Sequence, residues 1–242
     1  MPGTVRTRHA PAAQKLRPLI VLETAGWAAL DAASKSAFET MLERLESAGI
    51  GLIRRSGDPL VENLECAVAD AGAICSAITG WENRWSQRSL VDQNPEGVSE
   101  RTKATLAKAE ALTLADYRAA LIDRQTAQQC YARVAPLADA VITLSCPGPA
   151  PLWSGDQPGE PLAPRPTGDP VFNYPSSMLF APAVSVPLLA VGSMPLGVQL
   201  MGQQHEDAKI TAMARWLLSA LPDARLVAGD QIGRLHLLAI MQ

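Results

Sequence analysis

The chain has 242 residues, of which 48% are hydrophobic, so it can form one large domain or two small ones around an apolar core. Its net charge is −3, from 21 basic and 24 acidic residues, and this balance argues against a nucleic-acid-binding protein and against a polybasic membrane-surface protein. No apolar run approaches the roughly 20 residues that a bilayer-spanning helix needs.

The cysteines and histidines indicate neither a disulfide scaffold nor a metal site. No two of the 4 cysteines have Cys-x-x-Cys spacing, and only 3 histidines are present. We therefore expect no metal and no other cofactor, and a reducing, cytoplasmic environment. Residues 1–16 are mildly basic and lack the apolar stretch of a secretory signal, which predicts a flexible leader.

The first predicted elements form a strand–helix–strand unit. Leu19–Leu22 is a short apolar run typical of a buried strand, and Ile50–Ile53 is a second one. Between them, Asp31 can cap a helix that runs to about Ala48, where Gly49 ends it. This order predicts that the two strands pair in parallel. The apolar stripe of the helix consists of Phe38, Met41, Leu42 and Leu45.

Helical patterns fill the next part of the chain. Residues Leu60 to Thr79 carry apolar side chains at spacings of three and four, which predicts one amphipathic helix with Cys75 on its core face. Residues 86–111 are polar and predict a loop followed by an exposed helix. Thr113 resembles the first residue of a capping box, opening a helix that could run to Val134. A buried strand is expected at Ala140–Leu144.

The composition changes after this strand, because most of the 19 prolines lie between residues 147 and 195. Proline disrupts helices and central strands, so this stretch is expected to be mostly loops. The short elements expected after Pro147 are a helical turn or two at Ser176–Phe180, strands at Ala183–Val186 and Gly197–Met201, and a helix from Asp207 to Ala220. Residues 223–242 form an apolar tail.

No motif for an activated nucleophile is present. The sequence has no Gly-x-Ser-x-Gly elbow, no Ser-x-x-Lys pair and no Gly-Gly dipeptide that could open an oxyanion-binding loop. Cys146 follows a strand, and His205 could in principle act as its base, but nothing orients either group. A structural role for Cys146 is the favoured interpretation.

Four ordered blocks resemble the amidase signature family. They are separated by gaps close to those of the family, and the second contains Thr-Gly-Asp-Pro at 167–170. Upstream, Gly26-Trp27 after the first strand and Leu114–Tyr117 at a helix start are similar to the same family in outline. The blocks are Val141–Pro151, Thr167–Pro175, Ala183–Pro187 and Pro195–Gly202.

This resemblance implies the C-terminal half of the amidase signature fold over residues 17–222, an α/β domain with a mixed, mainly parallel sheet flanked by helices. The family hydrolyses carboxamide C–N bonds with two serines and a lysine, which lie in its N-terminal half and cannot be assigned to any residue here. The resemblance places a substrate-pocket wall at Asn173, Tyr174, Ser176, Ser177 and Phe180. Phe180 stands where a small glycine is common in the family. It either narrows the pocket or packs into core space left by Ser176.

Three functional hypotheses follow. In the first, the chain is a catalytically incomplete part of an amidase-family hydrolase. In the second, it is a subunit that completes an amidase whose Ser-Ser-Lys half is a separate chain. The third hypothesis is a non-catalytic module that binds a small amide. A half-sheet leaves an edge and an apolar face without neighbours, so we expect the missing half or a second copy of the chain as partner.

Overall fold

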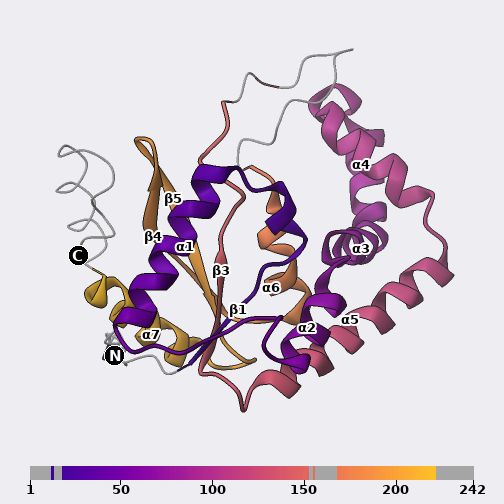
Figure 1. Ribbon diagram of the computed structural model, residues 1–242. Helices are drawn as coiled ribbons and strands as arrows, with labels where there is room; N and C mark the ends of the chain where they lie inside the picture. Colours follow the sequence, from indigo (N-terminus) through magenta and orange to yellow (C-terminus); the bar gives the residue numbers. More distant parts are fainter. Residues whose placement is uncertain (1–11, 14–17, 153–154, 156–167, 222–242) are drawn as a thin grey trace, which may run out of the picture.

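The computed structural model describes residues 12–13, 18–152, 155 and 168–221. One mixed sheet lies between two layers of helices (Figure 1). Its strands are β1 (Leu19–Val21), β2 (Leu52–Ile53), β3 (Ala140–Leu144), β4 (Ala183–Val191) and β5 (Met194–Met201). The α-helices are α1 (Ala32–Ser47), α2 (Pro59–Val68), α3 (Ala71–Gln93), α4 (Glu100–Glu110), α5 (Leu114–Val134), α6 (Tyr174–Leu179) and α7 (Asp207–Ala220). Short 3₁₀ helices are η1 (Ala25–Ala29), η2 (Pro95–Gly97) and η3 (Pro170–Phe172).

The strand order is β2-β1-β3-β5-β4. The predicted parallel pairing of the first two strands is confirmed, and β3 also pairs in parallel with β1. On its other side β3 pairs antiparallel with β5, and β5 pairs antiparallel with β4. The sheet is therefore mixed, as expected. Parallel pairs do not outnumber antiparallel ones among the described strands, because β4 and β5 form a hairpin joined at Gly192-Ser193.

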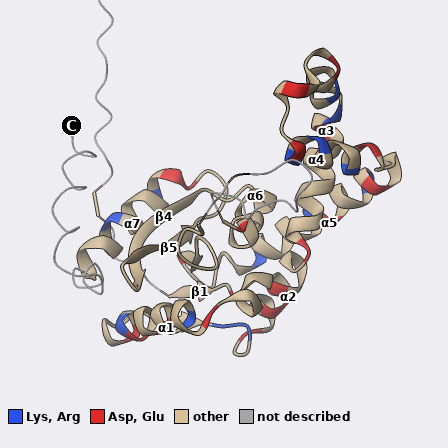
Figure 2. Cartoon of the chain, turned by 90° about the horizontal axis from the view of Figure 1, so that it is seen from above, with Lys and Arg blue, Asp and Glu red and all other residues tan. Residues whose placement is uncertain are grey.

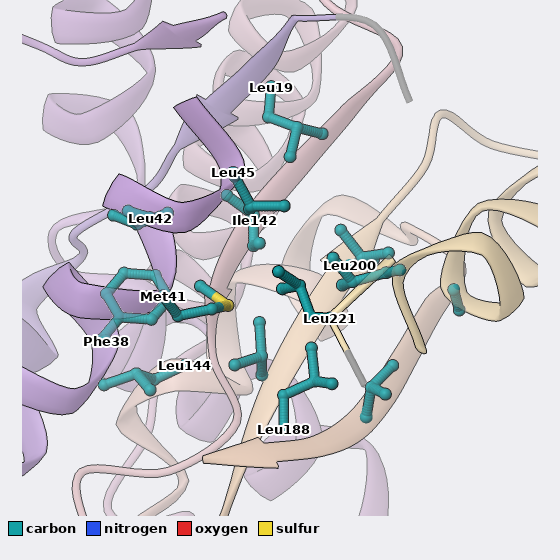
Figure 3. Close-up of a cluster of buried hydrophobic side chains, with 14 of the residues drawn as sticks. Leu19, Phe38, Met41, Leu42, Leu45, Ile142, Leu144, Leu188, Leu200 and Leu221 are labelled. Carbon is teal, nitrogen blue, oxygen red and sulfur yellow. The ribbon is translucent and has the colours of Figure 1, made fainter. Parts of the chain in front are cut away.

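The first core lies between the sheet and the layer of α1 and α7. Asp31 caps α1 as predicted, accepting a hydrogen bond from the Ser34 backbone N–H, and Gly49 has a left-handed φ of 82° just past the helix end. The predicted apolar stripe of α1 packs on alternate strand residues such as Leu19, Ile142 and Leu200 (Figure 3). The stripe residues Phe38, Met41, Leu42 and Leu45 are all buried.

The second core lies under α2, α3, α5 and α6. The predicted capping box at Thr113 is present, and α5 ends at Val134 as expected. The single helix predicted over residues 60–79 is wrong, because the chain breaks at Ala69-Asp70 into α2 and α3. Both pieces bury their apolar faces against the same core, with α5 packed on each, so the apolar spacing continues across the break. Cys75 packs against this core as predicted.

The α3–α4 arm was only partly predicted. The loop expected from residue 86 is wrong, since α3 continues to Gln93, while the exposed helix expected after it is α4. This arm projects away from the sheet (Figure 2). Trp81 of the arm stacks on Tyr117 of α5 with ring centroids 5.5 Å apart, and the Arg84 guanidinium lies 3.3 Å from the Trp81 ring centroid.

The proline-rich region holds longer strands than the sequence suggested. β4 and β5 extend through Pro187 and Pro195, where loops were expected. Pro187 falls at the irregularity between Val186 and Leu189, where the ladder shifts register. Pro195 lies beyond the end of the β3–β5 ladder, so its missing N–H removes no bond to β3.

The leader expected at residues 1–16, apart from residues 12 and 13, and the tail at 223–242 lie outside the described residues. None of the described helices combines the length and apolar character needed to cross a bilayer.

Gly26 provides a test of the packing between the η1 and η3 segments. A β-carbon on Gly26 would lie 2.6 Å from the ring of Phe172, which is fully buried. We expect Gly26→Ala to lower the free energy of unfolding by about 1–3 kcal/mol, because the ring has no room to move aside. Urea unfolding followed by circular dichroism measures this change.

The matched control is Gly57→Ala. Its β-carbon would meet only the Arg54 carbonyl oxygen at 3.6 Å, an ordinary contact. This variant should stay within about 0.5 kcal/mol of the wild type. Equal stability losses in the two variants would contradict the packing described here.

Candidate functional site

A polar cluster forms where β3 ends. The backbone N–H of Ser145 donates to the Gly197 carbonyl, so Ser145 continues the β3–β5 ladder by one residue. Asn173, between η3 and α6, donates a side-chain N–H to the Ser145 carbonyl oxygen at 3.0 Å. Phe172, the neighbour of Asn173, is fully buried and anchors this segment in the core. The cluster is thus attached to the most buried part of the sheet.

Two hydroxyls meet on the face of the sheet opposite α1 and α7. The Oγ atoms of Ser145 and Ser185 are 2.6 Å apart, and Gly197 lies between them on β5. A β-carbon on Gly197 would come within 2.8 Å of Ser185 Oγ and 2.9 Å of Ser145 Oγ. Glycine at 197 is therefore what allows the two hydroxyls to approach each other.

The row of residues next to this pair is also polar. Thr143 and Ser185 are both register partners of Gln199. The Gln199 side chain is buried and its N–H donates to the Phe172 carbonyl at 3.4 Å. The Thr143 hydroxyl is buried without a hydrogen-bond partner among the described residues. Uncharged donors and acceptors thus cross three strands of the sheet.

Strain is concentrated at the end of β1. Thr24 has φ 60° and ψ 177°, a backbone conformation that is largely restricted to glycine. Any other residue in this conformation is destabilised by on the order of 1–3 kcal/mol. Its hydroxyl accepts a hydrogen bond from Gly26, and its backbone N–H donates to the Glu65 carboxylate at 2.9 Å. Glu65 also accepts the N–H of Glu23. The carboxylate therefore holds the strained turn in place from α2.

Burial raises the pKa of Glu65, and the two backbone hydrogen bonds only partly oppose this shift. Glu65 is 3% exposed. The positive charge of Arg55 favours the charged form of its carboxyl group. Glu65 is a residue that sequence reasoning missed. It occupies a core position of an amphipathic helix, and nothing in its spacing distinguishes it from an exposed glutamate.

The five residues of the expected pocket wall lie in or beside α6. Ser176 is half-buried and its hydroxyl donates to the Asn173 carbonyl, while Ser177 is exposed. Tyr174 packs towards α3, where the Cys75 thiol donates to its carbonyl oxygen at 3.7 Å. Within the described structure, Asn173 is the one residue of the five that hydrogen-bonds to the polar cluster, through the Ser145 carbonyl.

Phe180 does not fill core space. It is 58% exposed and ends α6 in the left-handed conformation, with φ 53°. Its ring lies 4.9 Å from the Arg124 guanidinium of α5, in cation–π geometry. Packing of Phe180 into the core is thus wrong, and narrowing of a pocket stays a prediction.

Among the described residues, the polar cluster contains no base that could activate one of its hydroxyls as a nucleophile. Over the described ranges, the Ser145 and Ser185 hydroxyls bond to each other and to no lysine, histidine or carboxylate. A serine needs such a base to attack a carbonyl. The Cys146 thiol donates to the Gly148 carbonyl at 3.1 Å rather than to His205. No three metal-ligating side chains gather in the described part of the chain.

An open groove lies elsewhere, between the α2–α3 junction and α5. Its lining includes Asp70, Asp123, Cys66 and several alanines, and none of the expected pocket-wall residues. The Cys66 thiol has a raised pKa because it donates to Glu62, so it is a poor nucleophile. The groove therefore has no connection with the polar cluster.

Replacing Glu65 with glutamine tests its buried carboxyl group. A carboxyl whose pKa is raised by folding stabilises the fold fully below its unfolded pKa of about 4.5 and loses that contribution as the pH rises through the folded pKa. The free-energy difference between wild type and Glu65→Gln should therefore decrease as the pH rises from 4.5. Urea unfolding at a series of pH values between 4 and 8, as an approximate range, measures it.

Glu62→Gln is the control for this experiment. Glu62 is half-buried and the hydrogen bonds that it accepts from Arg55 lower its pKa, so its contribution is lost as the pH falls. The difference for this variant should not decrease over the same range. A constant or increasing difference for Glu65→Gln would show that its carboxyl is not shifted as described.

No protein-family model and no curated protein match the sequence. Solved structures do match. An amidase crystal structure has a TM-score of 0.72 at 22% identity, over 87% of this chain and 47% of that chain. An s-triazine catabolic enzyme, in the inhibitor-bound form of a vestigial protein complex, has a TM-score of 0.65 at 19% identity, over 86% and 43%.

A bacterial aryl acylamidase of the amidase signature family has a TM-score of 0.56 at 12% identity, over 90% of this chain and 47% of that chain. The chain thus spans about half the length of the structures it matches. The common part includes the mixed sheet and the helices on its two faces. The chain therefore has the fold of about half of an amidase signature enzyme.

Proposed function

We propose that this chain is the C-terminal part of an amidase-family hydrolase and is catalytically incomplete on its own. The observation that carries the proposal is the combination of an amidase fold of half length with a polar cluster that contains no base. In such an enzyme the reacting serines and lysine come from the other half. That half is either a preceding part of the same polypeptide or a separate chain.

The part played by this chain is to form one wall of the substrate pocket. Asn173, Ser176, Ser177 and Phe180 are the wall residues that α6 presents at or near the surface. Neutral amide and hydroxyl groups suit a carboxamide, because they match its donor and acceptor without bringing an unpaired charge. Tyr174 supports the wall from behind through its contact with α3.

The cytoplasmic location proposed for the protein rests on its cysteines. All four lie in the described residues and are free thiols. Free thiols in a chain of this size are usual in a reducing compartment.

The polar cluster also supports a second candidate, a module that binds a small amide without turnover. The cluster is assembled entirely within this chain, from β3, β4, β5 and the η3–α6 junction. Binding could therefore occur without a second half. Isothermal titration calorimetry with simple carboxamides on the chain alone separates this candidate from the first, because only a binding module should give saturable heats.

The test of the proposed function is a reconstitution assay. The purified chain alone should hydrolyse a panel of simple carboxamides and anilides no faster than buffer, because neither Ser145 nor Ser185 is hydrogen-bonded to a base in the described structure. Adding a separately expressed N-terminal half that contains the Ser-Ser-Lys residues should give hydrolysis. The control is the same N-terminal half with its nucleophilic serine replaced by alanine. Hydrolysis at enzyme-like rates by the chain alone would refute the proposal.

A further inference from the structure

Among the described residues, part of one face of the β4–β5 hairpin has no helix packed on it. The inward residues of the hairpin, such as Val186 and Val198, are buried against α1 and α7. Several residues that point the other way are exposed or half-buried, whereas Gln199 and Met201 on the same side are buried. We call this surface the hairpin face, and it consists of Ser145, Ala183, Ser185, Pro187, Pro195 and Gly197.

The hairpin face carries no charge, which is unusual for a surface in contact with water. From Pro170 to Gln204 the sequence contains no Asp, Glu, Lys or Arg. Figure 2 shows β4 and β5 without red or blue segments, whereas α1 and the α3–α4 arm carry both colours and α2 carries red. Depletion of charged residues is typical of the core of a protein–protein interface and not of a free surface.

The edge of the sheet beside this face has little protection among the described residues. β4 ends the strand order, so one side of this strand has no partner among the described strands. Soluble proteins usually guard such an edge with lysine, a very short strand or a covering helix. β4 spans 9 residues and has only its register shift at Pro187 as a guard. The edge and the adjoining face can therefore both be covered by one partner.

The length of the matching structures indicates what that partner is. This chain covers 87% of itself but 47% of the amidase, so about half of that fold has no counterpart here. A surface that is uncharged and lies beside an open strand edge can accept an added strand and the small residues packed behind it. The small side chains at positions 145, 183, 185 and 197 allow a close backbone approach.

We propose that the hairpin face and the free edge of β4 are the docking surface for the polypeptide that supplies the other half of the amidase fold. This inference rests on the proposed function and adds to it the contact surface. The partner pairs a strand with the outer edge of β4 and covers the Ser145–Ser185 hydroxyl pair. The hydroxyl pair then becomes part of the boundary between the two halves.

Ser185→Arg is the test variant, because Ser185 is exposed at the centre of the face and an arginine there would bring an unpaired charge into the interface. Ser36→Arg on α1 is the matched control, since Ser36 is also exposed but lies in the helix layer on the opposite side of the sheet. Circular dichroism and thermal melting first establish that both variants fold as the wild type does.

The probes are N-terminal halves of the amidase, the s-triazine catabolic enzyme and the aryl acylamidase, each titrated into the full chain by calorimetry. We expect at least one half to bind, with affinity at least about tenfold weaker for Ser185→Arg and unchanged for Ser36→Arg, which corresponds to about 1.4 kcal/mol or more. Equal affinity of wild type and Ser185→Arg would overturn the docking surface while the proposed function stands.

Absence of binding by all three halves would instead overturn the proposed function together with the inference. Light scattering on the chain alone covers the remaining occupant. The proposal would be contradicted if the wild type is a dimer, Ser185→Arg is a monomer, and adding an N-terminal half does not dissociate the wild-type dimer. That result would show that a second copy of the chain occupies this face.

Discussion

The pairing of β3 with both of its neighbours is the constraint on which the rest of the structure depends. β3 is the only described strand bonded in parallel on one side, to β1, and antiparallel on the other, to β5. All five of its residues are buried, and successive side chains point into opposite cores. Ile142 belongs to the core that includes α1, and Val141 belongs to the core that includes α5. Without β3 the sheet would separate into a βαβ unit and a hairpin. The polar cluster sits where this strand ends because only there do both parts of the sheet come together.

Much of the fold could be predicted from residue patterns. Local signals were strong where the residues that begin or end an element are themselves characteristic. Examples are the Asp31 cap and Gly49 of α1 and the capping box of α5. The short run of apolar and β-branched residues at 140–144 identified β3 with its correct ends. These elements are defined by neighbours within a few residues, and such information is present in the sequence itself.

The errors arose where a distant contact decides the structure. The spacing of apolar residues in α2 and α3 fits one helix, and the break between them follows from packing around α5. The strands in the proline-rich region were predicted too short because proline was expected to end a strand. Pro187 lies at the register shift of β4 and Pro195 lies beyond the β3–β5 ladder, so both are tolerated within strands. The site followed the same rule. The neighbourhood of Asn173 was expected, whereas the meeting of Ser145 with Ser185 depends on strand register and on the missing side chain of Gly197.

The central position of β3 has a consequence for how the chain folds. Leu19 of β1 pairs with Ala140 of β3, so a long helical excursion lies between two adjacent strands of the sheet. Closing a loop of this length costs chain entropy before the strand pairing can stabilise the fold. Topologies rich in such contacts therefore fold slowly. During synthesis, β1 and β2 emerge with α1 well before their neighbour exists. The edge of β1 that pairs with β3 therefore stays unpaired until the ribosome has synthesised and released the second half of the chain.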